Sequence, residues 1–149
     1  MRFPFAHSMR LIAIAALLLL ASPVVAQESV ISAVDANAML TEGKLLLIDL
    51  RTPEEWRQTG VPAEARRINV HDPEGPAAFL EKVLGAAGGD KSRPIGLICR
   101  VGNRSTQAQK LLLAKGFTNV VNIKEGVMGN DSGPGWIKRG LPTDACPSC

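Results

Sequence analysis

A cysteine followed closely by two arginines marks the part of this sequence best suited to covalent chemistry. Cys99 comes directly after the apolar run 95–98, and Arg100 and Arg104 flank a turn that leads into a helix-like segment. Successive backbone N–H groups of such a turn can converge on one point, and the positive end of the following helix adds to their field. Positive surroundings stabilise a thiolate, which is the nucleophilic form of cysteine. We therefore expect Cys99 to be a nucleophile rather than an inert buried thiol.

The residues after the cysteine have the composition of an anion-binding loop. Gly102 permits the positive φ that a nest of backbone amides often uses, and two arginines supply full positive charges. A small anion is therefore the expected substrate. The candidate binding residues are Arg100, Val101, Gly102, Asn103, Arg104 and Ser105.

The other two cysteines lie near the end of the chain, in residues 143–149. Cys146 and Cys149 have the Cys-x-x-Cys spacing of a redox pair, but they do not open a helix within a β-α unit. A local disulfide is the favoured interpretation, and the alternatives are a thiol redox function of the pair and a role in resolving a sulfur adduct on Cys99. Two thiols are half a zinc site, and His71 beside Asp72 is typical of an exposed turn. We expect no metal and no cofactor.

The composition predicts one globular domain. The chain has 149 residues, of which 46% are hydrophobic and 21% are charged, enough for one compact core. The formal net charge of +3 falls to +1 without residues 1–26, which hold two arginines and no acid. This balance gives no electrostatic basis for binding nucleic acid.

Residues 1–26 resemble a secretory signal peptide. Arg2 and Arg10 precede the unbroken apolar run 11–21, and small residues end the segment at Ala26. We expect cleavage after Ala26, which leaves a periplasmic or secreted protein with no stable membrane anchor. An uncleaved N-terminal anchor is the alternative, although the apolar run is short for a membrane span.

Short apolar runs separated by helix-sized segments must position the cysteine. The predicted strands are 30–33, 45–48, 67–70, 95–98 and 120–123, and the predicted helices are 34–40, 76–84 and 105–115. A further short helix is expected to open at Pro53, with Thr52 as its N-cap, and to be closed by Gly60 and Pro62. The continuously apolar run 45–48 is typical of a strand covered on both faces of a parallel sheet. Trp136 and Ile137 are expected to anchor the glycine-rich segment that follows the last strand. The pattern predicts an α/β domain whose central, mostly parallel, five-stranded sheet is flanked by helices, with Asp49 and Cys99 at carboxyl ends of strands.

Several segments, taken in their order along the chain, resemble motifs of the rhodanese-like domain family. The resemblance rests on segments 47–56, 60–62, 68–70, 99–105, 122–126 and 135–142. It implies an α/β fold over residues 27–142 and a catalytic cysteine, Cys99, that accepts a sulfane sulfur as a persulfide. It also implies that the amides of residues 100–105 cradle the anion and that Arg104 closes the loop. Asp49 and Arg51 match the family's Asp-x-Arg motif, where scaffold hydrogen bonding is expected. The segment 60–65 departs from the family's His-Ile-Pro-Gly-Ala run, so its turn geometry is open.

The loop length separates two kinds of cysteine enzyme. Cys99 and Arg104 enclose four residues, whereas related cysteine phosphatases use five to fit a tetrahedral phosphate. The shorter loop indicates a pocket for a sulfur atom. We therefore expect a sulfurtransferase that moves sulfur from a thiosulfate-like or persulfide donor, through Cys99, to cyanide or a thiol acceptor. A non-catalytic rhodanese-like module that relays sulfur or binds partners is the alternative.

Overall fold

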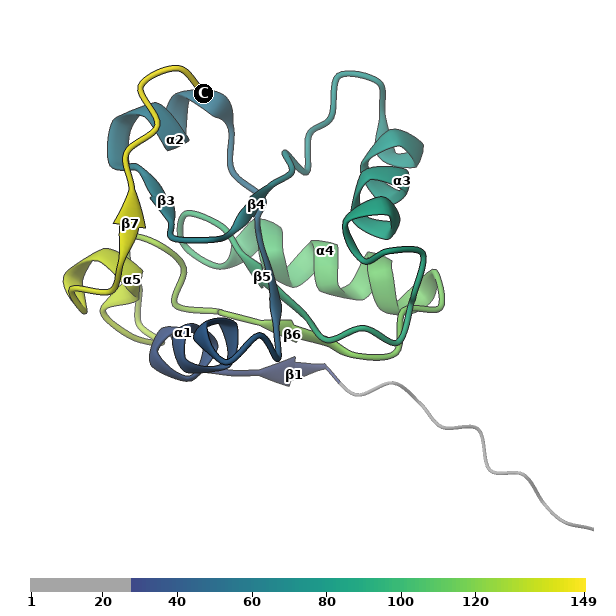
Figure 1. Ribbon diagram of the computed structural model, residues 1–149, viewed down its shortest axis with the longest axis horizontal. Coiled ribbons are helices and arrows are strands. Elements are labelled where there is room, and N and C mark those ends of the chain that lie inside the picture. The colour runs from purple at the N-terminus through teal and green to yellow at the C-terminus, as the bar shows by residue number, and fades with distance from the viewer. Residues whose placement is uncertain (1–27) are drawn as a thin grey trace, which may run out of the picture.

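A five-stranded parallel sheet forms the centre of the computed structural model, which describes residues 28–149 (Figure 1). The strands lie in the order β1-β6-β5-β2-β4, and each neighbouring pair is parallel. Their bounds are β1 Ser29–Val30, β2 Leu46–Asp49, β4 Arg66–Arg67, β5 Ile95–Ile98 and β6 Val120–Asn122. The predicted α/β class and five-stranded sheet are confirmed. The expected signal peptide lies outside the described residues.

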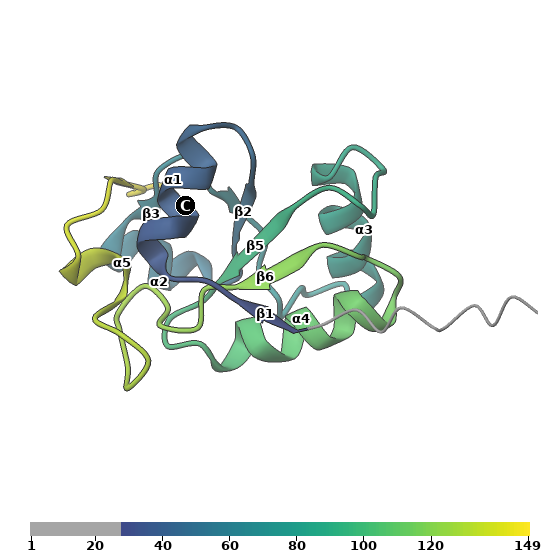
Figure 2. The same ribbon diagram turned by 90° about the horizontal axis from the view of Figure 1, so that it is seen from below.

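Helices cover both faces of the sheet (Figure 2). The helices α1 (Ala33–Thr41) and α5 (Gly135–Lys138) pack on one face, and α3 (Pro76–Ala86) and α4 (Asn103–Ala114) pack on the other. Leu46 and Ile48 of β2 face α3 and α4, while Leu47 between them faces α1 and α5. Both faces of β2 are therefore buried, as its continuous apolar sequence predicts.

Helix α2 (Pro53–Thr59) follows β2 at the carboxyl edge of the sheet. Thr52 accepts a hydrogen bond from the backbone of Glu55, and the Glu55 carboxylate accepts one from the backbone of Thr52. This capping box satisfies two backbone donors at the start of the helix. Gly60, with φ of 75°, ends the helix. The predicted cap and end of this helix are confirmed.

Several boundaries differ from the sequence prediction, among them that of β4, which spans Arg66–Arg67 rather than 67–70. The first strand ends at Val30 rather than residue 33, because the Ser32 side chain accepts a hydrogen bond from Asp35 and caps α1. Helix α4 begins at Asn103 rather than Ser105, because Gly102 adopts a φ of 91° at the N-cap. The helix therefore starts closer to Cys99 than the sequence suggests.

A second, two-stranded sheet continues the structure beyond residue 142. Strand β7 (Thr143–Asp144) pairs antiparallel with β3 (Val61–Pro62). Trp136 is fully buried, and its Nε1 donates a hydrogen bond to the carbonyl of Pro142 at 2.8 Å, which fixes the approach to β7. Among the helices of residues 28–149, none has the length and apolar character needed to cross a membrane.

Candidate active site

The thiol of Cys99 lies inside the turn between β5 and α4. Cys99 is only 1% exposed and has a free thiol. Its sulfur accepts hydrogen bonds from the backbone N–H groups of Gly102, at 3.1 Å, and Ser105, at 3.4 Å. The thiol donates to Ser105 Oγ at 3.5 Å, and that hydroxyl donates to the Gly102 carbonyl at 3.1 Å. Two backbone donors therefore already point at the sulfur, and a thiolate would accept both.

The segment after β6 holds the loop carbonyls away from this sulfur. The carbonyls of Cys99, Arg100 and Val101 accept hydrogen bonds from Val127 N, Met128 N and Asn130 Nδ2, at 2.9, 2.9 and 2.8 Å respectively. Because a trans peptide directs its C=O and N–H in opposite directions, these contacts turn the amides to the other side. The Val101–Gly102 peptide illustrates this, since its carbonyl meets Asn130 and its N–H meets the sulfur.

Further backbone donors of the loop have no acceptor within residues 28–149. They are the amides of Arg100, Val101, Asn103 and Arg104. The amides of Asn103 and Arg104 also belong to the first turn of α4, where the helix dipole favours negative charge. The loop can thus offer several hydrogen bonds to an anion bound beside Cys99.

Two glycines make the close approach between the loop and the segment after β6 possible. A Cβ at Gly102 would overlap the Lys124 carbonyl oxygen, and one at Gly126 would lie 2.5 Å from the Arg100 carbonyl oxygen. Both residues also have positive φ, 91° and 70°, which other residues rarely adopt. Any larger residue at either position would push the loop from its supporting carbonyl contacts.

Arg104 contacts a carboxylate from α2. Its Nη1 and Nη2 donate to the two carboxylate oxygens of Glu55 at 2.7 and 2.6 Å. This paired contact joins the first turn of α4 to the first turn of α2. Arg104 therefore holds the active-site loop against α2, and its terminal nitrogens are engaged by protein rather than directed freely at a substrate.

The Arg104 contact keeps Glu55 ionised. Burial alone would raise the pKa of Glu55, but it is outweighed by the hydrogen bonds from Arg104 and the Thr52 backbone and by the charges of Arg104 and Arg51. The pKa of Glu55 falls from 4.5 to about 2. The hydrogen bond from Glu55 also raises the pKa of Arg104. Both groups are charged at every pH near neutrality.

Asp49 and Arg51 form a fully buried ion pair beneath α2. Arg51 Nη2 lies 2.6 Å from Asp49 Oδ2 and also donates to the Gly60 carbonyl, while Nη1 donates to Thr59 Oγ1 at 2.6 Å. These bonds tie the end of β2 to the C-terminal end of α2. The pair therefore provides the scaffold hydrogen bonding that the family resemblance implied.

A comparison with known protein families settles the class of this arrangement. The family model described as "Rhodanese-like domain" matches residues 32–130. This chain belongs to that family. The match includes the whole Cys99 loop, helix α2 and the segment up to Asn130 that holds the loop carbonyls.

Several relatives of this rhodanese-like domain carry sulfurtransferase names. It is 34% identical over 125 residues to "Thiosulfate sulfurtransferase 16, chloroplastic" from Arabidopsis thaliana, covering 78% of this chain and 93% of the relative. It is 32% identical over 98 residues to a "Sulfurtransferase" from Allochromatium vinosum, covering 66% and 77%. Its fold matches the polysulfide-sulfur transferase homodimer from Wolinella succinogenes with a TM-score of 0.59, 27% identity and coverage of 78% of each chain.

The remaining predicted site residues of the rhodanese-like domain have distinct surroundings. Arg100 is half-buried, and its side chain makes no hydrogen bond or ion pair within the described part of the chain. Val101 is 38% exposed and points to solvent. Asn103 and Arg104 line a small cavity beside the loop. This cavity has a volume of about 230 Å³ and is lined by Val70, His71, Asn103, Arg104 and Gln107.

Sequence reasoning missed two residues that shape the site. Glu55 was recognisable as a helix-capping acid, but nothing in the sequence pairs it with Arg104, 49 positions away. Asn130 carried no signal for its two hydrogen bonds, to the Val101 and Lys124 carbonyls.

Cys146 and Cys149 form a disulfide, with Cα atoms 5.3 Å apart, and do not contact Cys99.

Proposed function

We propose that this rhodanese-like domain is a sulfurtransferase that uses Cys99 as the sulfur carrier. The Cys99 thiolate attacks the outer sulfur of a thiosulfate-like anion. A new sulfur–sulfur bond forms to Cys99 while the bond within the donor breaks, and sulfite leaves with the bonding electron pair. Cys99 then carries the transferred sulfur as a persulfide.

The second half of the cycle returns the cysteine to its thiolate form. Cyanide attacks the terminal sulfur of the persulfide, the sulfur–sulfur bond breaks, and thiocyanate leaves. A thiol acceptor would take the same sulfur and become a persulfide itself. No general base is required when the attacking thiol is already ionised.

The observation that carries this proposal is the set of backbone donors around one sulfur atom. The N–H groups of Gly102 and Ser105 bind the Cys99 sulfur, and the carbonyls of the loop are held away from it. Donors fixed in place before the reaction stabilise charge on the thiolate, and on the terminal persulfide sulfur, without reorganisation. Arg100, with no side-chain partner within residues 28–149, is available to hold the incoming anion.

The alternative is a rhodanese-like module that binds sulfur or partners without turnover. A module that had lost the chemistry would be expected to lack the cysteine or to have an open loop. Here Cys99 is a free thiol, and its loop is supported from two sides, by Glu55 and by Asn130. These contacts favour the enzyme.

Thiocyanate formation from thiosulfate and cyanide tests the proposal. We expect turnover by the wild-type protein and none by Cys99→Ser, whose hydroxyl is far less nucleophilic than a thiolate. Cys146→Ser together with Cys149→Ser serves as a matched control for removing cysteine elsewhere. Equal rates for the wild type and Cys99→Ser would refute the assignment, and a complete lack of turnover by a folded wild type would favour the binding module.

We also propose that the protein acts after export, in the periplasm or outside the cell. The proposal rests on the sequence of residues 1–26 and on the disulfide between Cys146 and Cys149, a bond that persists in oxidising compartments. Mass spectrometry of the protein recovered from cell fractions tests it. We expect an exported form that begins at Gln27, and a cytoplasmic protein that retains Met1 or residues 2–26 would contradict it.

A further inference from the structure

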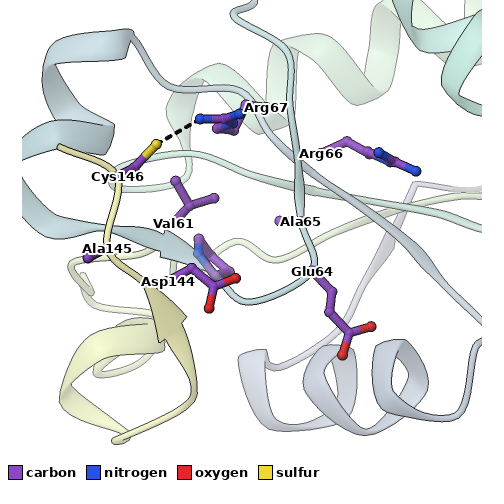
Figure 3. A pocket seen from close by; sticks show the side chains of 9 residues that line it. Val61, Glu64, Ala65, Arg66, Arg67, Asp144, Ala145 and Cys146 are labelled. Carbon is purple, nitrogen blue, oxygen red and sulfur yellow. Dashed lines mark hydrogen bonds between the residues drawn. The ribbon is translucent and has the colours of Figure 1, made fainter. Parts of the chain in front are cut away.

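An arginine of β4 contacts both sulfurs of the terminal disulfide. Arg67 Nη1 lies 2.7 Å from Cys146 Sγ, the contact drawn in Figure 3, and 2.5 Å from Cys149 Sγ. The neighbouring Arg66 points away from Cys146 in the same view. A second arginine, Arg57 of α2, donates to the main-chain oxygen of Cys149 at 2.5 Å. Two cations from different elements therefore hold the Cys-x-x-Cys segment.

The segment is open to other molecules at Cys146. This residue lines two open cavities, one of about 370 Å³ beside β3 and β4 and one of about 400 Å³ beside the end of α2. Both cysteines are half-buried, and both sulfurs contact Arg67. A thiol can therefore approach Cys146 while the guanidinium lies beside the pair.

We infer that the Cys146–Cys149 disulfide is a thiol–disulfide exchange site for a dithiol reductant, with Arg67 stabilising the thiolate that leaves. This function is separate from sulfur transfer at Cys99. It differs from a purely structural clasp, because a structural disulfide needs neither an open sulfur nor a cation placed against both sulfurs.

The exchange has two steps. A thiolate of the dithiol attacks Cys146 Sγ, a mixed disulfide forms, and Cys149 leaves as a thiolate beside Arg67. The second thiol of the reductant, as its thiolate, then attacks the mixed disulfide, and Cys146 leaves. Two electrons and two protons pass from the dithiol to the cysteine pair, and the reductant ends as a disulfide.

Arg67→Ala and Arg66→Ala make a matched pair for the test. Both arginines are exposed on the same short strand, so the fold should tolerate either change equally. The proteins are equilibrated in glutathione buffers, alkylated and digested with trypsin, whose cleavage after Arg139 separates both tail cysteines from Cys99. The reduced fraction of the terminal peptide then gives the reduction potential of this disulfide alone, independently of any sulfurtransferase activity.

We expect Arg67→Ala to make the pair harder to reduce by about tenfold in the equilibrium constant, or about 30 mV, and to slow its reduction by dithiothreitol about three- to tenfold. Arg66→Ala should match the wild type, and Arg67→Lys, which keeps the charge, should recover most of the effect. Equal potentials for the Arg67→Ala and Arg66→Ala variants would overturn the inference.

Discussion

The contact between Arg104 and Glu55 should stabilise the fold by an amount that depends on pH. Arg104→Ala removes both hydrogen bonds from the Glu55 carboxylate, whose side chain is 14% exposed in the wild type. The difference between a pKa of 4.5 and one of about 2 corresponds to about 3.5 kcal/mol, at roughly 1.4 kcal/mol per pH unit, and Arg104 supplies only part of it. We therefore expect the variant to lose about 2–3 kcal/mol of unfolding free energy at pH 7, because burial still disfavours the unpaired carboxylate.

The sign of the pH dependence follows from the direction of the pKa shift. The pKa of Glu55 is lower in the folded protein than in the unfolded chain, so its stabilising contribution is complete above pH 4.5. It is lost as the pH falls from 4.5 toward 2, where the folded protein must also bind the proton. The stability difference between the wild type and Arg104→Ala should therefore be largest near neutral pH and should shrink below pH 4.5.

Urea unfolding followed by the fluorescence of Trp56 and Trp136 measures this difference at pH 7 and at pH 3. The double-mutant cycle of Arg104→Ala with Glu55→Gln isolates the pair, and we expect a coupling energy of about 2 kcal/mol at pH 7. Lys44→Ala is the control, since the Lys44 contact with Glu42 is exposed and should contribute little. A coupling energy near zero, or a cost of Arg104→Ala that does not change with pH, would refute the reasoning.

Three further substitutions test other parts of the structure. Gly102→Ala should reduce the free energy of unfolding by about 2 kcal/mol and abolish sulfur loading, since its Cβ overlaps a neighbouring carbonyl at a positive φ; urea unfolding that matches the wild type would contradict this. Asp49→Asn should cost about 3–5 kcal/mol by leaving Arg51 buried without its counter-charge, and a wild-type melting temperature would contradict it. Replacing Cys146 and Cys149 together by Ser should leave thiocyanate formation intact; a stall only with thiol acceptors would show that the pair resolves the persulfide.

The sheet and the position of Cys99 could be predicted because their signals are local. The apolar run 45–48 has a length and composition typical of a strand buried on both faces, and Gly60 ends the helix that Thr52 starts. A cysteine directly after such a strand must lie at the carboxyl edge of the sheet. The site therefore follows from the order of elements, without any knowledge of distant contacts.

The features that escaped prediction depend on contacts between distant parts of the chain. The backbone of Ala33 donates to Glu125, 92 positions away, which helps to start α1 one residue before its predicted first residue. The strands β3 and β7 have two residues each, too few for any periodic pattern. They form because the fold places these two distant segments side by side, where they pair. The support of the Cys99 loop by Asn130 is of the same kind.

Persulfide formation on Cys99 is the most direct test of the proposed function. The purified protein is treated with thiosulfate, and its intact mass and tryptic peptides are measured before and after addition of cyanide. We expect a gain of roughly 32 Da, one sulfur atom, on the peptide that contains Cys99, and its loss to cyanide. An unchanged mass in a folded protein whose Cys99 can still be alkylated would contradict the account.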